Sequence, residues 1–146
     1  MRTMLVVVAV GLLMGANKAA DSSKKDMEQL QGEWSMVSGE IDGQALPQEY
    51  VKGAKRVAKG NETRVMIAGR LFLKAKFTID PTKKPKTIDY TMTGGPTKGK
   101  KQLGIYELVG DKVKFCFAAP GKARPTDFST KEGSGRTLSV WKRAKK

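Results

Sequence analysis

The chain has 146 residues, a formal net charge of +14 and one cysteine, Cys116, but no histidine. This composition fits a single domain without an internal disulfide. It also lacks the most common general base and the most common metal ligand of proteins. We therefore expect no metal site, no cofactor and no enzymatic activity.

Residues 1–20 are predicted to be a secretory signal peptide. Arg2 supplies a positive charge, an almost unbroken apolar run follows from Met4 to Gly15, and small residues end the segment between Ala16 and Ala20. The run is shorter than the roughly 20 residues that a membrane-spanning helix needs. The sequence therefore predicts a secreted or periplasmic protein, with no transmembrane anchor in the mature chain.

A short helix is predicted for residues 21–31, ahead of a barrel domain in residues 32–146. Ser23 and Asp26 have the spacing of a capping box at a helix start. Met27 and Leu30 would lie on one face of this helix. Because so short a helix is not stable alone, we expect that face to pack on the rest of the chain.

From residue 32 onward, turn residues recur about every ten residues between short β-prone runs, which is typical of an all-β sandwich or barrel. We predict an eight-stranded antiparallel meander barrel, because closure removes the exposed edges of a sheet. The predicted strands are 33–41, 54–59, 62–68, 71–79, 86–92, both arms of a hairpin within 104–118, and 136–143.

Two segments show the alternation of a half-buried strand most clearly. In the first, Leu71 to Ile79, every second residue is apolar and the intervening residues are mostly polar. The second is the hairpin, in which Gly110-Asp111 suits a two-residue turn. This turn pairs Leu108 with Val113, Tyr106 with Phe115 and Gly104 with Phe117 on the inner face, and Glu107 with Lys114 on the outer face together with Cys116.

The register between the second and third predicted strands places Arg64 inside the barrel, which is costly for a charged side chain. Either the turn there is longer than two residues, or this arginine lies at the barrel mouth.

Several stretches of the mature chain occur together in a known domain family. They are MEQLQGEW, DGQALP, IDPTKKPKTID, GGPTKGKKQLGIYELVGDKVKFCFA and GKARPTDF, followed by a last strand ending in WKR. In these stretches, over nearly its full length, the mature chain resembles a secreted domain family known mainly from planctomycete bacteria. The family is regarded as lipocalin-like and carries no established activity, so the resemblance implies a barrel and export but no function.

Residues 32–34, Gly-Glu-Trp, match the Gly-x-Trp pattern that opens the first strand of lipocalins. There, an arginine on the last strand packs over the tryptophan and closes the barrel base. The resemblance implies this role for Arg143 over Trp34, with Arg136 as the second candidate. The lipocalin Thr-Asp-Tyr motif has no counterpart, because Asp89-Tyr90 comes too early and lacks the threonine. Its absence weighs against a classical lipocalin binding role.

Our first functional hypothesis is an exported, monomeric barrel that binds a small apolar molecule. Barrels of about eight strands either hold one small ligand or are filled by side chains, and the sequence leaves both possibilities open. The predicted inner wall consists of Met36, Leu73, Phe77, Tyr106, Phe115 and Leu138.

A long connection, residues 119–135, is a candidate functional loop, because loops of this length are uncommon in compact domains. Its Arg124 and Phe128 could form a lid over the barrel mouth and contact a ligand. Alternatively, Phe128 packs into the core and Arg124 pairs with Asp127.

The alternative hypothesis is a basic module that binds anionic polysaccharide or another polyanion of the cell envelope. Without Arg2 and Lys18 the mature chain has 26 basic and 14 acidic residues, a net charge of +12 that attracts polyanions at low salt. No aromatic residues alternate with the lysines, so we expect no specific nucleic-acid binding. The loop cations that would make diffuse contacts are Lys83, Lys84, Lys86, Lys98, Lys100, Lys101, Lys122 and Arg124.

Overall fold

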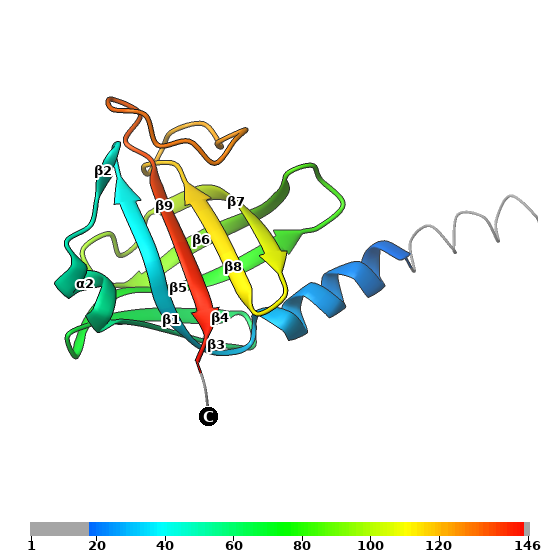
Figure 1. Cartoon of the computed structure of the whole chain (residues 1–146). Helices are drawn as coiled ribbons and strands as arrows, with labels where there is room; N and C mark the ends of the chain where they lie inside the picture. Colours follow the sequence, from blue (N-terminus) through cyan, green and yellow to red (C-terminus); the bar gives the residue numbers. More distant parts are fainter. Residues whose placement is uncertain (1–17, 145–146) are drawn as a thin grey trace, which may run out of the picture.

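Eight strands of the chain close into an antiparallel barrel (Figure 1). The strands are β1 (Gly32–Ile41), β2 (Gln44–Ala45), β3 (Ala54–Lys59), β4 (Glu62–Ile67), β5 (Arg70–Asp80), β6 (Lys86–Gly94), β7 (Lys101–Val109), β8 (Lys112–Phe117) and β9 (Thr137–Arg143). Their order in the sheet is β2-β1-β3-β4-β5-β6-β7-β8-β9, and pairing of β1 with β9 closes the ring. Successive strands from β3 onward are sequence neighbours, and the two-residue strand β2 only extends the sheet at the end of β1. The predicted eight-stranded antiparallel meander barrel is therefore confirmed.

The computed structural model describes residues 18–144, so residues 1–17 of the predicted signal peptide lie outside it. Residues 18–30 form the N-terminal helix. A second helix, α2, spans Gln48–Gly53.

The N-terminal helix packs on the barrel through the predicted face. Leu30 is buried in the core and Met27 packs against it. Residues 18–22 are already helical, so the prediction that Ser23 caps the helix start is wrong. No helix among residues 18–144 is long and apolar enough to cross a membrane.

A helix lies beside each end of the barrel, and the N-terminal helix runs outward from the end where β1 begins (Figure 1). At the end of β3, the Gln31 side chain exchanges two hydrogen bonds with the backbone of Gly60 and so ties the N-terminal helix to the barrel. The start of β3 follows directly on α2, a helix that was not predicted, whose Val51 is buried. Leu30 of the N-terminal helix and Val51 of α2 thus bury apolar side chains at the two ends.

The β7–β8 hairpin has the predicted register, with Tyr106 opposite Phe115 and Gly104 opposite Phe117. Gly110 adopts a φ of 58°, as the predicted two-residue turn requires. A Cβ atom on Gly104 would lie 2.5 Å from Cδ1 of Phe117. Only glycine at this position leaves room for the inward-pointing ring.

The predicted inward position of Arg64 is wrong. Lys59 pairs with Glu62 across a two-residue turn, and this register places Arg64 opposite Val57 on the outer face. Arg64 is exposed, whereas Thr63 and Val65 of the same strand are buried. The inward arginine is instead Arg56, on the neighbouring strand.

The start of β5 also differs from the predicted alternation. A register shift between Val65 and Met66 pairs Met66 with Leu71 on the outer face. Leu71 and Phe72 are therefore 43% and 47% exposed. From Leu73 onward the predicted alternation holds, because the shift resets which residues point inward.

Candidate functional site

The barrel interior is filled by side chains. Of the predicted inner wall, Phe77, Tyr106 and Phe115 are buried, and Met36 and Leu73 pack against the same core. The free space beside Phe77 and Phe115 is a cavity of about 10 Å³, enough for about one water molecule. Small-molecule pockets usually measure about 300–1,000 Å³, so this cavity does not have the size of a ligand site.

A buried arginine occupies the centre of this core. Arg56 is only 5% exposed, and its Nη1 donates hydrogen bonds to Tyr90 Oη at 2.6 Å and to Thr63 Oγ1 at 3.2 Å. The guanidinium carbon lies 4.7 Å from the Phe115 ring centre and 4.6 Å from that of Trp141. Among residues 18–144 no carboxylate forms an ion pair with it. The two rings and two hydroxyls therefore offset the cost of burying this charge.

Trp34 and Arg143 lie together at the barrel end near the N-terminal helix. The Arg143 guanidinium carbon is 4.4 Å from the Trp34 ring centre. Arg143 also donates to the backbone oxygens of Gln29 and Gln31, and Trp34 Nε1 donates to the Leu30 oxygen. The contact implied by the lipocalin resemblance is present, and Arg136 lies elsewhere, beside Asp127.

Asp26 makes a second contact between the N-terminal helix and the same end of the barrel. Its buried carboxylate accepts a hydrogen bond from Tyr106 Oη at 2.7 Å and lies 2.9 Å from Lys86 Nζ. Burial, reinforced by the hydrogen bond to Asp26, raises the pKa of the Tyr106 hydroxyl well above its ordinary value. This tyrosine is thus a structural contact to the helix and not a free hydroxyl facing a ligand.

The raised pKa of Tyr106 predicts an alkaline loss of stability. Above a pH of about 10 the unfolded tyrosine releases its proton while the folded one keeps it, so the free energy of unfolding falls as pH rises. Tyr106→Phe removes this contribution. Urea unfolding from neutral pH to about pH 11 should show the difference between wild type and variant shrinking above about pH 10. A constant difference over the whole range would contradict the assignment.

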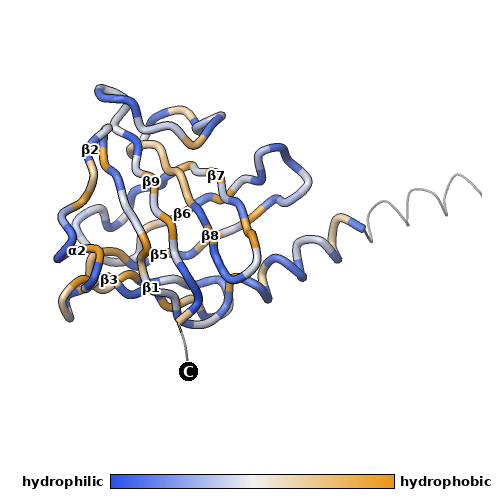
Figure 2. The backbone as a smooth tube through the Cα atoms, viewed as in Figure 1, coloured by the Kyte–Doolittle hydropathy of each residue, from blue (hydrophilic) through white to orange (hydrophobic). Residues whose placement is uncertain are grey.

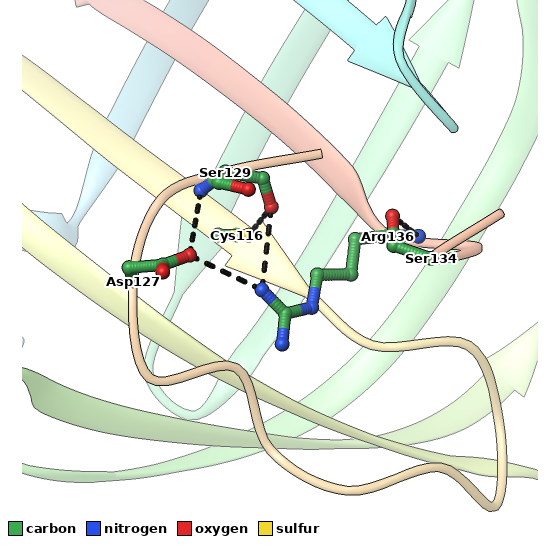
Figure 3. A network of polar contacts seen from close by, with 5 residues as sticks. All are labelled: Cys116, Asp127, Ser129, Ser134 and Arg136. Carbon is green, nitrogen blue, oxygen red and sulfur yellow. Dashed lines mark hydrogen bonds and ion pairs between the residues drawn. The ribbon is translucent and has the colours of Figure 1, made fainter. Parts of the chain in front are cut away.

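The part of the long connection 119–135 that holds Asp127 and Ser129 lies against the outer face of the barrel, over Cys116 of β8 (Figure 3). Asp127 forms an ion pair with Arg136 at 3.2 Å, and the Ser129 carbonyl oxygen accepts hydrogen bonds from Arg136 and from the Cys116 thiol. Cys116 is fully buried beneath this loop, and burial raises the pKa of its thiol. The predicted inward position of Leu138 is wrong, because Leu138 pairs with Cys116 on this outer face.

The predicted lid role of Arg124 and Phe128 is wrong for the same reason. Phe128 packs under the ammonium group of Lys114, 4.4 Å from its ring centre, on the outside of β8. Arg124 pairs with Asp89 at 2.7 Å, not with Asp127, and donates to the Gly104 carbonyl oxygen at 2.9 Å. Both side chains fasten the loop to the outer wall of the barrel.

An open groove of about 530 Å³ lies outside the barrel, where this loop meets the β5–β6 loop and the outer faces of β5, β6 and β7. We call it the outer groove. The β5–β6 loop that borders it is strongly hydrophilic (Figure 2). Side chains that line the groove include Thr78, Lys83, Lys84, Thr87, Asp89 and Arg124.

Some charged side chains of the outer groove form ion pairs or hydrogen bonds within the protein, and others do not. Lys83 and Lys84 are exposed and form no ion pair among residues 18–144. Arg124 is partly neutralised by Asp89. The Thr82 hydroxyl and backbone N–H donate to Asp80, and these hydrogen bonds lower the pKa of that carboxyl. The groove thus offers free ammonium groups beside hydroxyl donors and carboxylate acceptors.

The other predicted loop cations do not share this site. Lys98, Lys100 and Lys101 lie at the β6–β7 turn, at the opposite end of β6 from Lys83 and Lys84. Lys122 is exposed on the long loop, and Lys86 is engaged with Asp26. Of the eight predicted cations, the structure brings three to one site.

Comparisons of the chain with family models, curated proteins and solved structures found no match.

Proposed function

We propose that the protein is an exported binding module that holds an anionic polysaccharide in its outer groove. The signal-like N-terminus supports export, and the positive charge of the mature chain supports an anionic partner. Binding, not catalysis, is proposed, because the groove is lined by neither a histidine nor a cysteine.

The observation that carries the proposal is the convergence of three predicted cations on one groove. Lys83 and Lys84 come from the β5–β6 loop and Arg124 from the long loop, some forty residues further along the chain. Ammonium groups bind the carboxylates or sulfates of acidic sugars, while threonine hydroxyls and carboxylates hydrogen-bond sugar hydroxyls. Among residues 18–144 no aromatic ring lines the groove, so stacked nucleic-acid bases have no platform there.

A small apolar ligand inside the barrel is less well supported. It would need a pocket of about 300 Å³ or more, whereas the interior cavity measures about 10 Å³. The predicted wall residues instead fill the interior: Phe77, Tyr106 and Phe115 belong to the core, and Met36 and Leu73 pack against it. Of the two binding hypotheses raised by the sequence, the filled interior favours the polyanion.

Charge reversal tests the outer groove. Lys83→Glu/Lys84→Glu should weaken binding to polygalacturonate, a linear anionic polysaccharide, by at least about tenfold. The matched control is Lys98→Glu/Lys100→Glu, which changes the net charge equally on two exposed lysines of the β6–β7 turn. Titration calorimetry at physiological salt should give the control an affinity within about threefold of wild type.

Equal losses in the two variants would contradict a shaped groove, because they would indicate diffuse attraction to the net charge. Saturable one-to-one binding of an apolar dye to the folded protein, abolished by Tyr106→Trp, would instead support a ligand inside the barrel.

A further inference from the structure

The outer faces of β3, β4 and β5 carry a concentration of positive charge next to the outer groove. We call this surface the basic face. Its cations point outward in register with one another, and they are Lys55, Lys59, Arg64, Lys74 and Lys76. None of them was among the loop cations that the sequence suggested. None forms an ion pair within 4.0 Å among residues 18–144.

At the centre of the basic face, two like charges stand directly opposite each other. Arg64 of β4 pairs in register with Lys74 of β5, and Val57 lies on the other side of Arg64. Like charges in direct cross-strand positions destabilise a sheet. An anionic group lying between these two side chains would relieve that repulsion.

The next row of the face contains a single carboxylate between two lysines. Glu62 pairs in register with Lys59 of β3 and with Lys76 of β5. One carboxylate cannot neutralise both lysines, so this row also remains positive. The basic face therefore presents unneutralised positive charges, which complement the negative charges of an anionic polymer bound across it.

The basic face is continuous with the outer groove along β5. Lys74, Lys76 and Thr78 are successive outward residues of this strand, and Thr78 lines the groove. Outward residues of a strand are about 7 Å apart, so Lys76 lies one such step beyond the groove. A chain that leaves the groove at Thr78 reaches Lys76 and Lys74 without a gap.

We infer that the ligand of the outer groove is a linear anionic polysaccharide long enough to continue from the groove across β5 onto the basic face. This inference rests on the proposed function, which concerns the groove alone. It assigns a second role, the binding of further acidic sugar units, to Arg64, Lys74 and Lys76. It predicts that affinity increases with the length of the bound chain.

The test compares digalacturonate with a long oligogalacturonate by titration calorimetry. Wild type should bind the long oligomer at least about tenfold more tightly per molecule. Arg64→Glu/Lys74→Glu should reduce that affinity to nearly that of the dimer and leave dimer binding unchanged. Lys83→Glu/Lys84→Glu should weaken the binding of both ligands.

The matched control is Lys112→Glu/Lys142→Glu. These two residues form another pair of lysines in direct cross-strand register, on β8 and β9. The substitution therefore makes the same charge change on the far side of β1 from Lys55, the basic-face residue in its row, and does not touch Arg64, Lys74 or Lys76. It should leave the length dependence of binding intact. Far-ultraviolet circular dichroism and urea unfolding of each variant establish that the fold is retained.

Two failures are distinguishable. If the dimer and the long oligomer both bind in the groove but Arg64→Glu/Lys74→Glu leaves the length dependence unchanged, the basic face is not part of the site and only this inference is overturned. If neither ligand binds wild type, the proposed function itself is wrong.

Discussion

Trp34→Ala is expected to lower the free energy of unfolding by about 3–5 kcal/mol, the usual loss for a buried large aromatic side chain. Trp34 is 1% exposed, and it joins three parts of the protein. Its indole N–H donates to Leu30 of the N-terminal helix, and its face carries the guanidinium of Arg143 at the end of β9. Truncation removes these contacts and enlarges the adjacent cavity, which Trp34 helps to line.

Urea unfolding should show this loss as a lowered midpoint. Arg143→Ala should lower the free energy of unfolding by less than Trp34→Ala does. It removes the stacked cation, worth about 0.5–2 kcal/mol, and exposed hydrogen bonds to the helix carbonyls. A Trp34→Ala variant with the midpoint and slope of wild type would contradict the closing role of this residue.

Arg56→Ala is expected to cost about 2–5 kcal/mol, in the range of large-to-small substitutions in a core. The substitution leaves the Tyr90 and Thr63 hydroxyls without their shared donor and removes the cation between Phe115 and Trp141. It also joins the space of the side chain to the cavity of about 10 Å³ that Arg56 helps to line.

Arg64→Ala is the matched control for Arg56→Ala. The two arginines lie on adjacent strands, but Arg64 is exposed, and exposed substitutions usually change stability by no more than about 0.5 kcal/mol. Urea unfolding of both variants therefore measures which arginine points inward. Equal losses, or a larger loss for Arg64→Ala, would contradict the observed register of β3 and β4.

The strands were predictable where side-chain alternation and turn chemistry agree. In the β7–β8 hairpin, Gly110-Asp111 sets the turn and Gly104 faces Phe117, so the sequence indicates both the pairing and the inner face. The β3–β4 hairpin lacks this agreement, because a charged residue, Arg56, stands at an inward position of its strand. Its inward direction depends on the hydroxyls and rings that surround it, which come from four other strands.

The candidate site was predictable only in part. The sequence indicated that Lys83, Lys84 and Arg124 are surface cations, but their convergence depends on how the long loop folds back over β7. The same fold-back removed Arg124 and Phe128 from the barrel mouth. Local patterns do not specify where a loop without regular structure will pack. The register shift that exposes Leu71 and Phe72 likewise depends on a pairing between strands and not on β5 alone.

We expect the ligand to bind outside the filled barrel. The most direct measurement is a titration of isotope-labelled protein with a long oligogalacturonate, followed through backbone amide chemical shifts. We expect shifts centred on Thr78, Thr87 and Asp89 that continue to Arg64 and Lys74, with little change at the inner residues. Shifts centred on Phe77, Tyr90 and Phe115, with the outer groove unaffected, would contradict it.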